Sequence, residues 1–121
     1  MLIAPCSVKT LSGIANCFDD DLIVRAADVQ LKERRRVVLL FRETPLHAGH
    51  IELMAQATRN GAIVMPPVPA FYHRPQSLDN VVSQTVGRAL DLFGIDAGIV
   101  KRWQGTDPAR LKGRRTQGED E

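Results

Sequence analysis

The sequence has few aromatic residues, few cysteines, little excess charge and no long hydrophobic run. Aromatics make up 5% of its 121 residues, which is too few for a surface that stacks nucleobases, so we expect no nucleic-acid partner. Two cysteines cannot form a disulfide scaffold, and this favours the reducing cytoplasm. No apolar stretch reaches the ~20 residues of a membrane span, so none is expected. The net charge of +2 indicates only a weak preference for anionic ligands.

Three short apolar segments alternate with longer segments of helical periodicity. Strands are predicted over residues 1–5, 37–41 and 62–65, and helices over 7–18, 22–35, 47–60 and 77–93. The last helix carries an apolar stripe, including Leu78, Val82 and Val86, of the kind that faces a core. This alternation predicts parallel strands with right-handed crossovers in an α/β three-layer sandwich. Residues 106–121 are polar without periodicity and are predicted to be a disordered tail.

Each predicted strand is followed by a polar loop. The loops contain residues 6–10, 42–45 and 71–74. Because parallel strands place their carboxyl ends at one edge of the sheet, these loops are expected to converge on a ligand site. Ser7, Lys9 and Thr10 begin a helix, where backbone N–H groups favour an anion, although an ordinary cap beside a solvated lysine explains them too. The residues alone therefore predict a site for a phosphorylated ligand.

Other polar and sulfur-bearing residues have ordinary structural explanations. The basic run 32–36 suits a solvated helix end, and Arg88 either extends to solvent or binds an anion. His47 and His50 share a helix face but lack a third zinc ligand. Both cysteines, Cys6 and Cys17, are expected to be small buried residues.

Four stretches resemble the flavin prenyltransferases of the UbiX type, formerly described as aromatic-acid or 3-polyprenyl-4-hydroxybenzoate decarboxylases. They are APCSVKTLSGIA at 4–15, RAADVQLKERR at 25–35, RETPLH at 42–47 and MPPVPAFYHRPQSL at 65–78. The resemblance extends from residue 1 to about 105 and includes RWQG at 102–105. It implies a flavodoxin-like fold with a parallel sheet. It also implies that residues 1–105 are the C-terminal part of one flavin prenyltransferase domain.

The resemblance also implies a reaction. Family members transfer a dimethylallyl group from dimethylallyl phosphate to reduced FMN without a metal. The prenylated FMN then serves a UbiD-type decarboxylase in ubiquinone biosynthesis or aromatic-acid decarboxylation. The family assembles as a homo-oligomeric dodecamer with flavin sites between subunits, so a homo-oligomer is expected.

The family motifs assign roles to ten residues of this sequence. The FMN-binding positions correspond to Ser7, Val8, Lys9, Thr10 and Arg42. The dimethylallyl phosphate-binding positions correspond to Arg25, Lys32, Tyr72 and Arg88, and the catalytic positions to Lys32 and Glu43. Cationic groups and a tyrosine hydroxyl suit a departing phosphate, and Glu43 suits a general acid that protonates it.

Family members begin with strands and a G-A-S-G turn that have no counterpart before Met1. We therefore expect the chain to correspond to the C-terminal part of the family domain, with the N-terminal strands missing. Two alternatives stand beside the enzyme: a non-catalytic remnant that binds flavin or intact subunits, and an accessory subunit for aromatic-acid decarboxylation.

Overall fold

A parallel sheet of three strands forms the centre of the described structure. The computed structural model describes residues 1–100; the predicted tail and the RWQG motif lie outside this range. The strands are β1 (Leu2–Cys6), β2 (Val38–Phe41) and β3 (Ile63–Val64), hydrogen-bonded in the order β1-β2-β3. Val38 lies opposite Leu2 in β1 and opposite Ile63 in β3. Both pairings are therefore parallel as predicted, and the carboxyl ends of the three strands share one edge.

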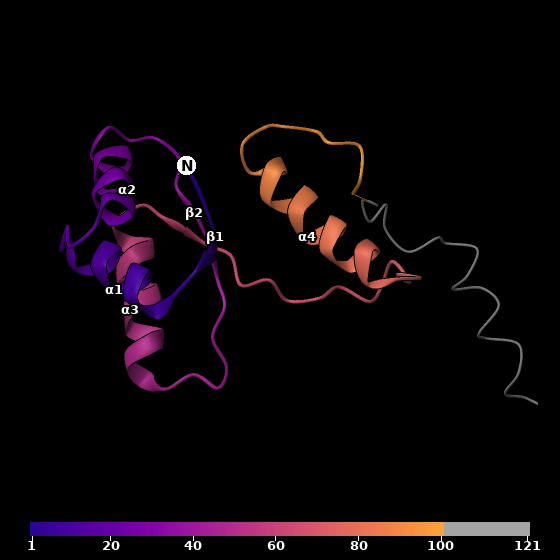
Figure 1. Ribbon diagram of the computed structural model, residues 1–121, viewed down its shortest axis with the longest axis horizontal. Coiled ribbons are helices and arrows are strands. Elements are labelled where there is room, and N and C mark those ends of the chain that lie inside the picture. The colour runs from indigo at the N-terminus through magenta and orange to yellow at the C-terminus, as the bar shows by residue number, and fades with distance from the viewer. Residues whose placement is uncertain (101–121) are drawn as a thin grey trace, which may run out of the picture.

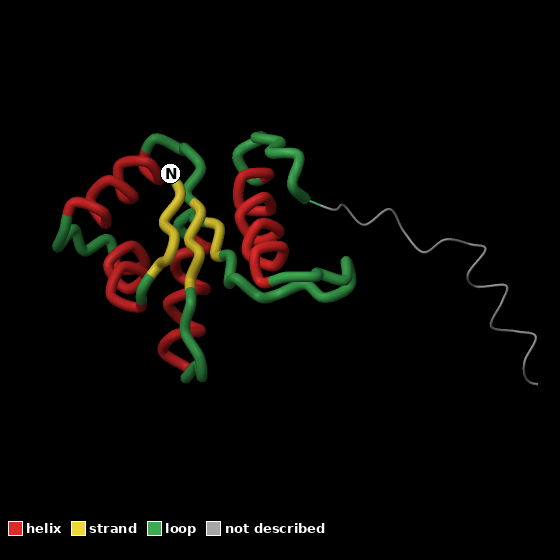
Figure 2. The backbone as a smooth tube through the Cα atoms, turned by 45° about the vertical axis from the view of Figure 1, so that its right-hand side comes forward, coloured by secondary structure: helices red, strands yellow, loops and turns green. Residues whose placement is uncertain are grey.

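Four helices flank this sheet. They are α1 (Val8–Asn16), α2 (Leu22–Lys32), α3 (Ala48–Arg59) and α4 (Leu78–Asp91). The first three lie on one side of the sheet and α4 lies on the other (Figures 1 and 2). Each begins at a side chain that accepts a backbone N–H, and these caps are Ser7, Asp21, His47 and Ser77. The predicted flavodoxin-like, three-layer α/β arrangement is confirmed.

The second helix ends earlier than the sequence predicted. Its last helical residue is Lys32 rather than Arg35. Arg34 has a φ of 58°, in the left-handed region, and its N–H donates to the carbonyl of Leu31. The N–H of Arg35 donates to the carbonyl of Gln30, so the chain turns back on the helix end. This closure directs residues 34–36 toward the start of β2.

The hydrophobic core lies between the sheet and helices α1–α3. Its largest fully buried side chains are Phe41, Leu11, Ile14, Leu39, Val24, Val37, Val38 and Cys6. Helices α1 and α2 approach closely at Gly13, where an added Cβ would lie 2.9 Å from Cγ2 of Val24. This packing fixes the start of α1 against the ends of β1 and β2.

The fourth helix does not bury the stripe that its periodicity indicated. The side chains of Leu78, Val82 and Val86 are 77%, 52% and 42% exposed. The buried positions of α4 are instead Gln84, Gly87 and Ala89. The segment after the helix covers this side, where the side chains of Ile99 and Val100 lie against Gly87. The predicted stripe is therefore only partly covered within residues 1–100, where Val81, Leu90 and Phe93 are half-buried.

The two cysteines differ in exposure, and the prediction that both are buried was wrong for Cys17. Cys17 ends α1 at the surface with a φ of 52°. Cys6 is 1% exposed, and its burial raises the pKa of its thiol to about 11. Because thiolate is the reactive form, the chain contains one accessible and one protected thiol.

We expect one thiol of the folded chain to react rapidly with a disulfide reagent at pH 8. At that pH only about one in a thousand Cys6 thiols is ionised, and its sulfur is buried, so labelling should stop near one thiol per chain and reach two after unfolding. Cys17→Ser should abolish the fast phase. Two fast thiols in the folded wild type would contradict the burial of Cys6.

The buried thiol also makes the free energy of unfolding depend on pH. Because burial raises the folded-state pKa of Cys6, its contribution to the free energy of unfolding is fully present below the unfolded-state pKa of about 8.5 and is lost as the pH rises toward 11.

Candidate functional site

The first turn of α1 follows the end of β1 and presents hydrogen-bond donors. Oγ of Ser7 accepts the N–H of Thr10 at 3.2 Å, and the Ser7 and Thr10 hydroxyls are 3.1 Å apart. The first N–H groups of a helix have no partner within it. With Thr10 satisfied by the cap, the N–H groups of Val8 and Lys9 remain for a ligand. The sequence-predicted group 7–10 is therefore brought together at the carboxyl end of β1.

The ammonium of Lys9 lies among carboxylates. Its Nζ is 3.4 Å from Asp20 and 3.5 Å from Asp21. The Val24 N–H, and then the charge of Lys9, lower the pKa of Asp21. The Lys9 side chain is 69% exposed, and exposed ion pairs contribute little stability. An incoming phosphate therefore competes with these aspartates at small cost.

Arg42 and Glu43 follow β2 in the loop before α3. Both side chains are exposed, and Arg42 has no ion pair among residues 1–100. The N–H of Arg42 donates to the carbonyl of Cys6 at 3.4 Å, which ties this loop to the end of β1. Oε1 of Glu43 accepts the N–H of Thr44 at 3.2 Å. The backbone of Arg42 is therefore tied to the end of β1, directly before the Ser7 cap of α1, and its exposed guanidinium has no ion pair within residues 1–100.

Tyr72 and Arg88 line one cavity although they are sixteen positions apart in the sequence. This cavity has a volume of about 200 Å³, and its walls include Met65, Pro66 and Gln84. The proline-rich segment after β3 forms one wall and α4 the other. Nη1 of Arg88 lies 3.0 Å from Oδ2 of Asp91. A tyrosine hydroxyl and a guanidinium in one small cavity suit the recognition of a phosphate.

Arg25 and Lys32 lie on α2, and no residue of α2 lines the cavity of Tyr72 and Arg88. Nη1 of Arg25 is 2.8 Å from Asp19 and 3.3 Å from Asp28. Nζ of Lys32 is 3.9 Å from Glu33. The structure of one chain therefore does not bring these two cations together with Tyr72 and Arg88.

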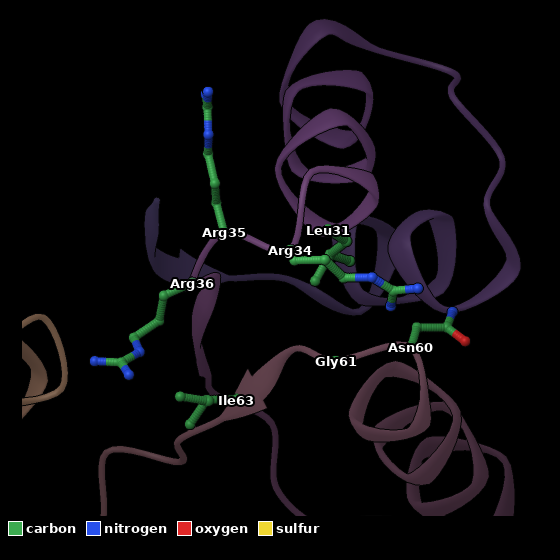
Figure 3. Close-up of a pocket in the computed structure, with 7 residues that line it drawn as sticks. All are labelled: Leu31, Arg34, Arg35, Arg36, Asn60, Gly61 and Ile63. Carbon is green, nitrogen blue, oxygen red and sulfur yellow. The ribbon is translucent and has the colours of Figure 1, made fainter.

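A larger cavity of about 360 Å³ lies at the opposite edge of the sheet, where β2 and β3 begin. Its lining residues are Leu31, Arg34, Arg35, Arg36, Asn60, Gly61 and Ile63. Arg34 extends toward Asn60, whereas Arg35 and Arg36 point away from it and from each other (Figure 3). The guanidinium of Arg36 donates to the carbonyl of Leu92 after α4. The three arginines do not converge on one anion, so the strand ends remain the better candidate site.

Within residues 1–100, no group of three or more His, Cys, Asp or Glu side chains is arranged to hold a metal ion. Over the same range, no helix combines the length and the apolar character that crossing a membrane demands.

Two features of the site were not predicted from the sequence. The acidic run 19–21 forms ion pairs with Lys9 and Arg25, which the sequence did not indicate. His47 and His50 were compared with a zinc site, yet they stack and cap α3. The i, i+3 spacing of these histidines at a helix start was the available signal, because it matches that of a capping box.

Known proteins match this chain over most of its length. The family model described as Flavoprotein matches residues 1–89. "Flavin prenyltransferase UbiX" of Thauera aromatica is 57% identical over 111 residues, which cover 92% of this chain and 57% of the relative. The protein of the same name from Escherichia coli K12 is 63% identical over 107 residues, covering 87% of this chain and 57% of the relative. The chain thus spans somewhat more than half the length of these relatives.

Solved structures show the same relationship. The crystal structure of AnUbiX (PadA1) in complex with FMN and dimethylallyl pyrophosphate has a TM-score of 0.85 and 53% identity, covering 88% of this chain and 57% of the other. A dodecameric FMN-dependent UbiX-like decarboxylase from Escherichia coli O157:H7 has a TM-score of 0.83 and 48% identity, covering 87% and 57%.

Proposed function

The chain belongs to the flavoprotein family, and from this premise we propose that it serves flavin prenylation, the transfer of a dimethylallyl group from dimethylallyl phosphate to reduced FMN. The observation that carries the proposal is the 57–63% identity to proteins named flavin prenyltransferase over about nine-tenths of this chain. A solved neighbour with 53% identity holds both FMN and a dimethylallyl compound. The polar strand-end loops lie inside residues 1–89, which the family model matches.

We assign FMN binding to the first turn of α1 and to Arg42. The N–H groups of Val8 and Lys9, the hydroxyls of Ser7 and Thr10 and the Lys9 ammonium are donors that suit a phosphate at a helix start. Arg42 has no ion pair in the described part of the chain and is tied to β1 by its backbone, which suits a planar, bidentate donor. Reduced flavin, when bound, supplies the nucleophilic ring that accepts the prenyl group.

The prenyl phosphate is assigned to Tyr72 and Arg88, with Arg25 and Lys32 as further cations. Breaking an allylic C–O bond leaves negative charge on the phosphate, so donors that hold this charge lower the barrier. The Arg88 side chain is 51% exposed whereas its partner Asp91 is 12% exposed, so the guanidinium keeps donors on its exposed side that can reach a phosphate while it stays paired with Asp91.

Glu43 is assigned as the general acid. It neighbours Arg42 in the loop after β2, and its carboxylate already accepts one N–H, from Thr44. When protonated, its free oxygen can donate a proton to the departing phosphate, and Lys32 supports the same charge.

A homo-oligomer is proposed because one chain separates the residues of α2 from the cavity of Tyr72 and Arg88. The solved neighbour from Escherichia coli O157:H7 is dodecameric, and the exposed side chains of Leu78, Val82 and Val86 give this chain an apolar contact surface.

We further propose that the product serves a UbiD-type decarboxylase. The proposed compartment is the cytoplasm, which suits two unpaired cysteines.

FMN binding tests this assignment. Arg42→Ala should raise the FMN dissociation constant by about 10- to 100-fold, because it removes hydrogen bonds to a charged ligand. The measurement is a titration followed by flavin fluorescence. Arg59→Ala is the matched control, since the guanidinium of Arg59 hydrogen-bonds only to Gln56 among the described residues, and it should leave the affinity unchanged. Equal losses in the two variants would contradict the role of Arg42.

A further inference from the structure

Two histidines at the start of α3 form a cap made of imidazole rings. Nδ1 of His47 accepts the N–H of Gly49 at 3.1 Å. Nδ1 of His50 accepts the N–H of His47 at 3.4 Å. The rings stack with centroids 3.7 Å apart and an interplanar angle of 26°. The two side chains thus take the positions that Ser or Thr and Glu or Gln occupy in an ordinary capping box.

This arrangement makes Nδ1 the acceptor nitrogen of both rings. A ring nitrogen that accepts an N–H carries no proton, so the geometry is that of the tautomer with its proton on Nε2. Protonation of His47 would replace the acceptor for Gly49 by a donor, and protonation of His50 would do the same to the N–H of His47. It would also place positive charge next to the positive end of the helix dipole, and two charged rings in a stack would repel.

The groups around the rings do not compensate for such a change. The cavity of about 580 Å³ beside them also receives Glu52 and Arg59 from α3 itself. Helix α1 packs against α3 and contributes Val8 and Asn16, which do not titrate. In the preceding loop, the Glu43 carboxylate lies on the Thr44 N–H. Arg59 has no acceptor atom, and within residues 1–100 no hydrogen bond joins the Glu52 carboxylate to the N–H groups of His47 or Gly49, which use the ring nitrogens instead.

The cap also holds one end of the loop that contains Arg42 and Glu43. The other end of this loop is fixed by β2, where Phe41 is 2% exposed. Only residues 42–46 separate that strand from His47, so release of the first turn of α3 frees the loop on one side. Histidine is the side chain that ordinarily gains its proton between pH 8 and 5.

We propose that His47 and His50 are positioning residues that form a proton-sensitive cap on α3 and thereby hold the Arg42–Glu43 loop. The consequence for flavin rests on the proposed function, whereas the cap itself does not. At neutral pH the loop is held; on acidification the first turn of α3 opens and FMN affinity falls.

The variant His47→Asn/His50→Gln tests this directly because it rebuilds a capping box that cannot titrate. Amide hydrogen exchange is measured at pH 7.5 and pH 5.0 and expressed as protection relative to the intrinsic rate. The amides followed are those of Gly49, of position 50 and of Ile51. In the wild type, protection should fall by about tenfold at pH 5.0, the size of a lost cap. The double variant should keep its protection, and His73→Asn, at the remaining histidine, should behave like the wild type.

Imidazole ¹⁵N chemical shifts of the wild type at pH 7.5 should show both rings with the proton on Nε2. A proton on Nδ1 of either ring, or the same pH dependence of protection in the wild type and the double variant, would overturn the proposal. FMN affinity measured in parallel should fall at pH 5.0 in the wild type and less in the double variant. If no FMN binds at pH 7.5, the proposed function fails, while the exchange data still decide for or against the cap.

Discussion

Replacement of Phe41 by alanine is expected to lower the free energy of unfolding by about 3–5 kcal/mol. Phe41 is the largest fully buried side chain of the core, and it lies at the end of the central strand β2. Its removal leaves a cavity that the surrounding strand and helices cannot fill without moving. Urea unfolding followed by circular dichroism measures the change.

Phe71→Ala is the matched control, because the chemical change is identical and Phe71 is 70% exposed. It should alter the free energy of unfolding by no more than about 0.5 kcal/mol. Since Phe41 directly precedes Arg42, Phe41→Ala should weaken FMN binding as well. Similar losses of stability in the two variants would contradict the core described for this chain.

Arg88→Ala is expected to lower kcat/KM for dimethylallyl phosphate on the order of 100-fold while FMN affinity stays unchanged. Arg88 lies with Tyr72 in the small cavity on the α4 side, away from the first turn of α1. Loss of its guanidinium removes charge stabilisation from the departing phosphate. Anaerobic turnover with reduced FMN and varied prenyl phosphate, together with a separate FMN titration, measures both quantities.

Arg88→Lys keeps the charge but loses the planar pair of donors, so its activity should lie between those of the wild type and Arg88→Ala. Arg59→Ala should match the wild type, because Arg59 does not line the cavity of Tyr72 and Arg88. If Arg88→Ala weakened FMN binding as much as it weakened prenyl transfer, the separation of the two binding regions would be wrong.

Local patterns were sufficient to predict most of the fold. The apolar run that became β2 and the caps Ser7 and Ser77 depend on nearby residues, so the sequence reveals them directly. The end of α2 was missed because Arg34 adopts a left-handed conformation that is more typical of glycine. The packing of α4 was missed because periodicity identifies an apolar face but not the surface that covers it.

The sequence predicted which residue types form the candidate site and at which edge of the sheet they lie. It predicted only part of how their side chains are arranged. Ser7 and Lys9 follow the carboxyl end of β1 and Arg42 follows that of β2, a placement that the parallel topology dictates. The ion pairs of Lys9 and Arg25 with the acidic run were not predicted, because they depend on how the α1–α2 turn folds back. The cavity shared by Tyr72 and Arg88 depends on the path of the proline-rich segment, so the residues around Tyr72 and those around Arg88 could not predict it separately.

The most direct test of flavin prenylation is the fate of FMN after reaction with this chain. The chain is incubated anaerobically with reduced FMN and dimethylallyl phosphate, and the flavin is then extracted and analysed by mass spectrometry and absorbance. The account predicts a flavin that is heavier by one dimethylallyl group, formed by the wild type and strongly reduced in Arg88→Ala. Recovery of unmodified FMN from a chain that binds FMN normally would contradict the enzymatic assignment and favour a non-catalytic flavin-binding protein.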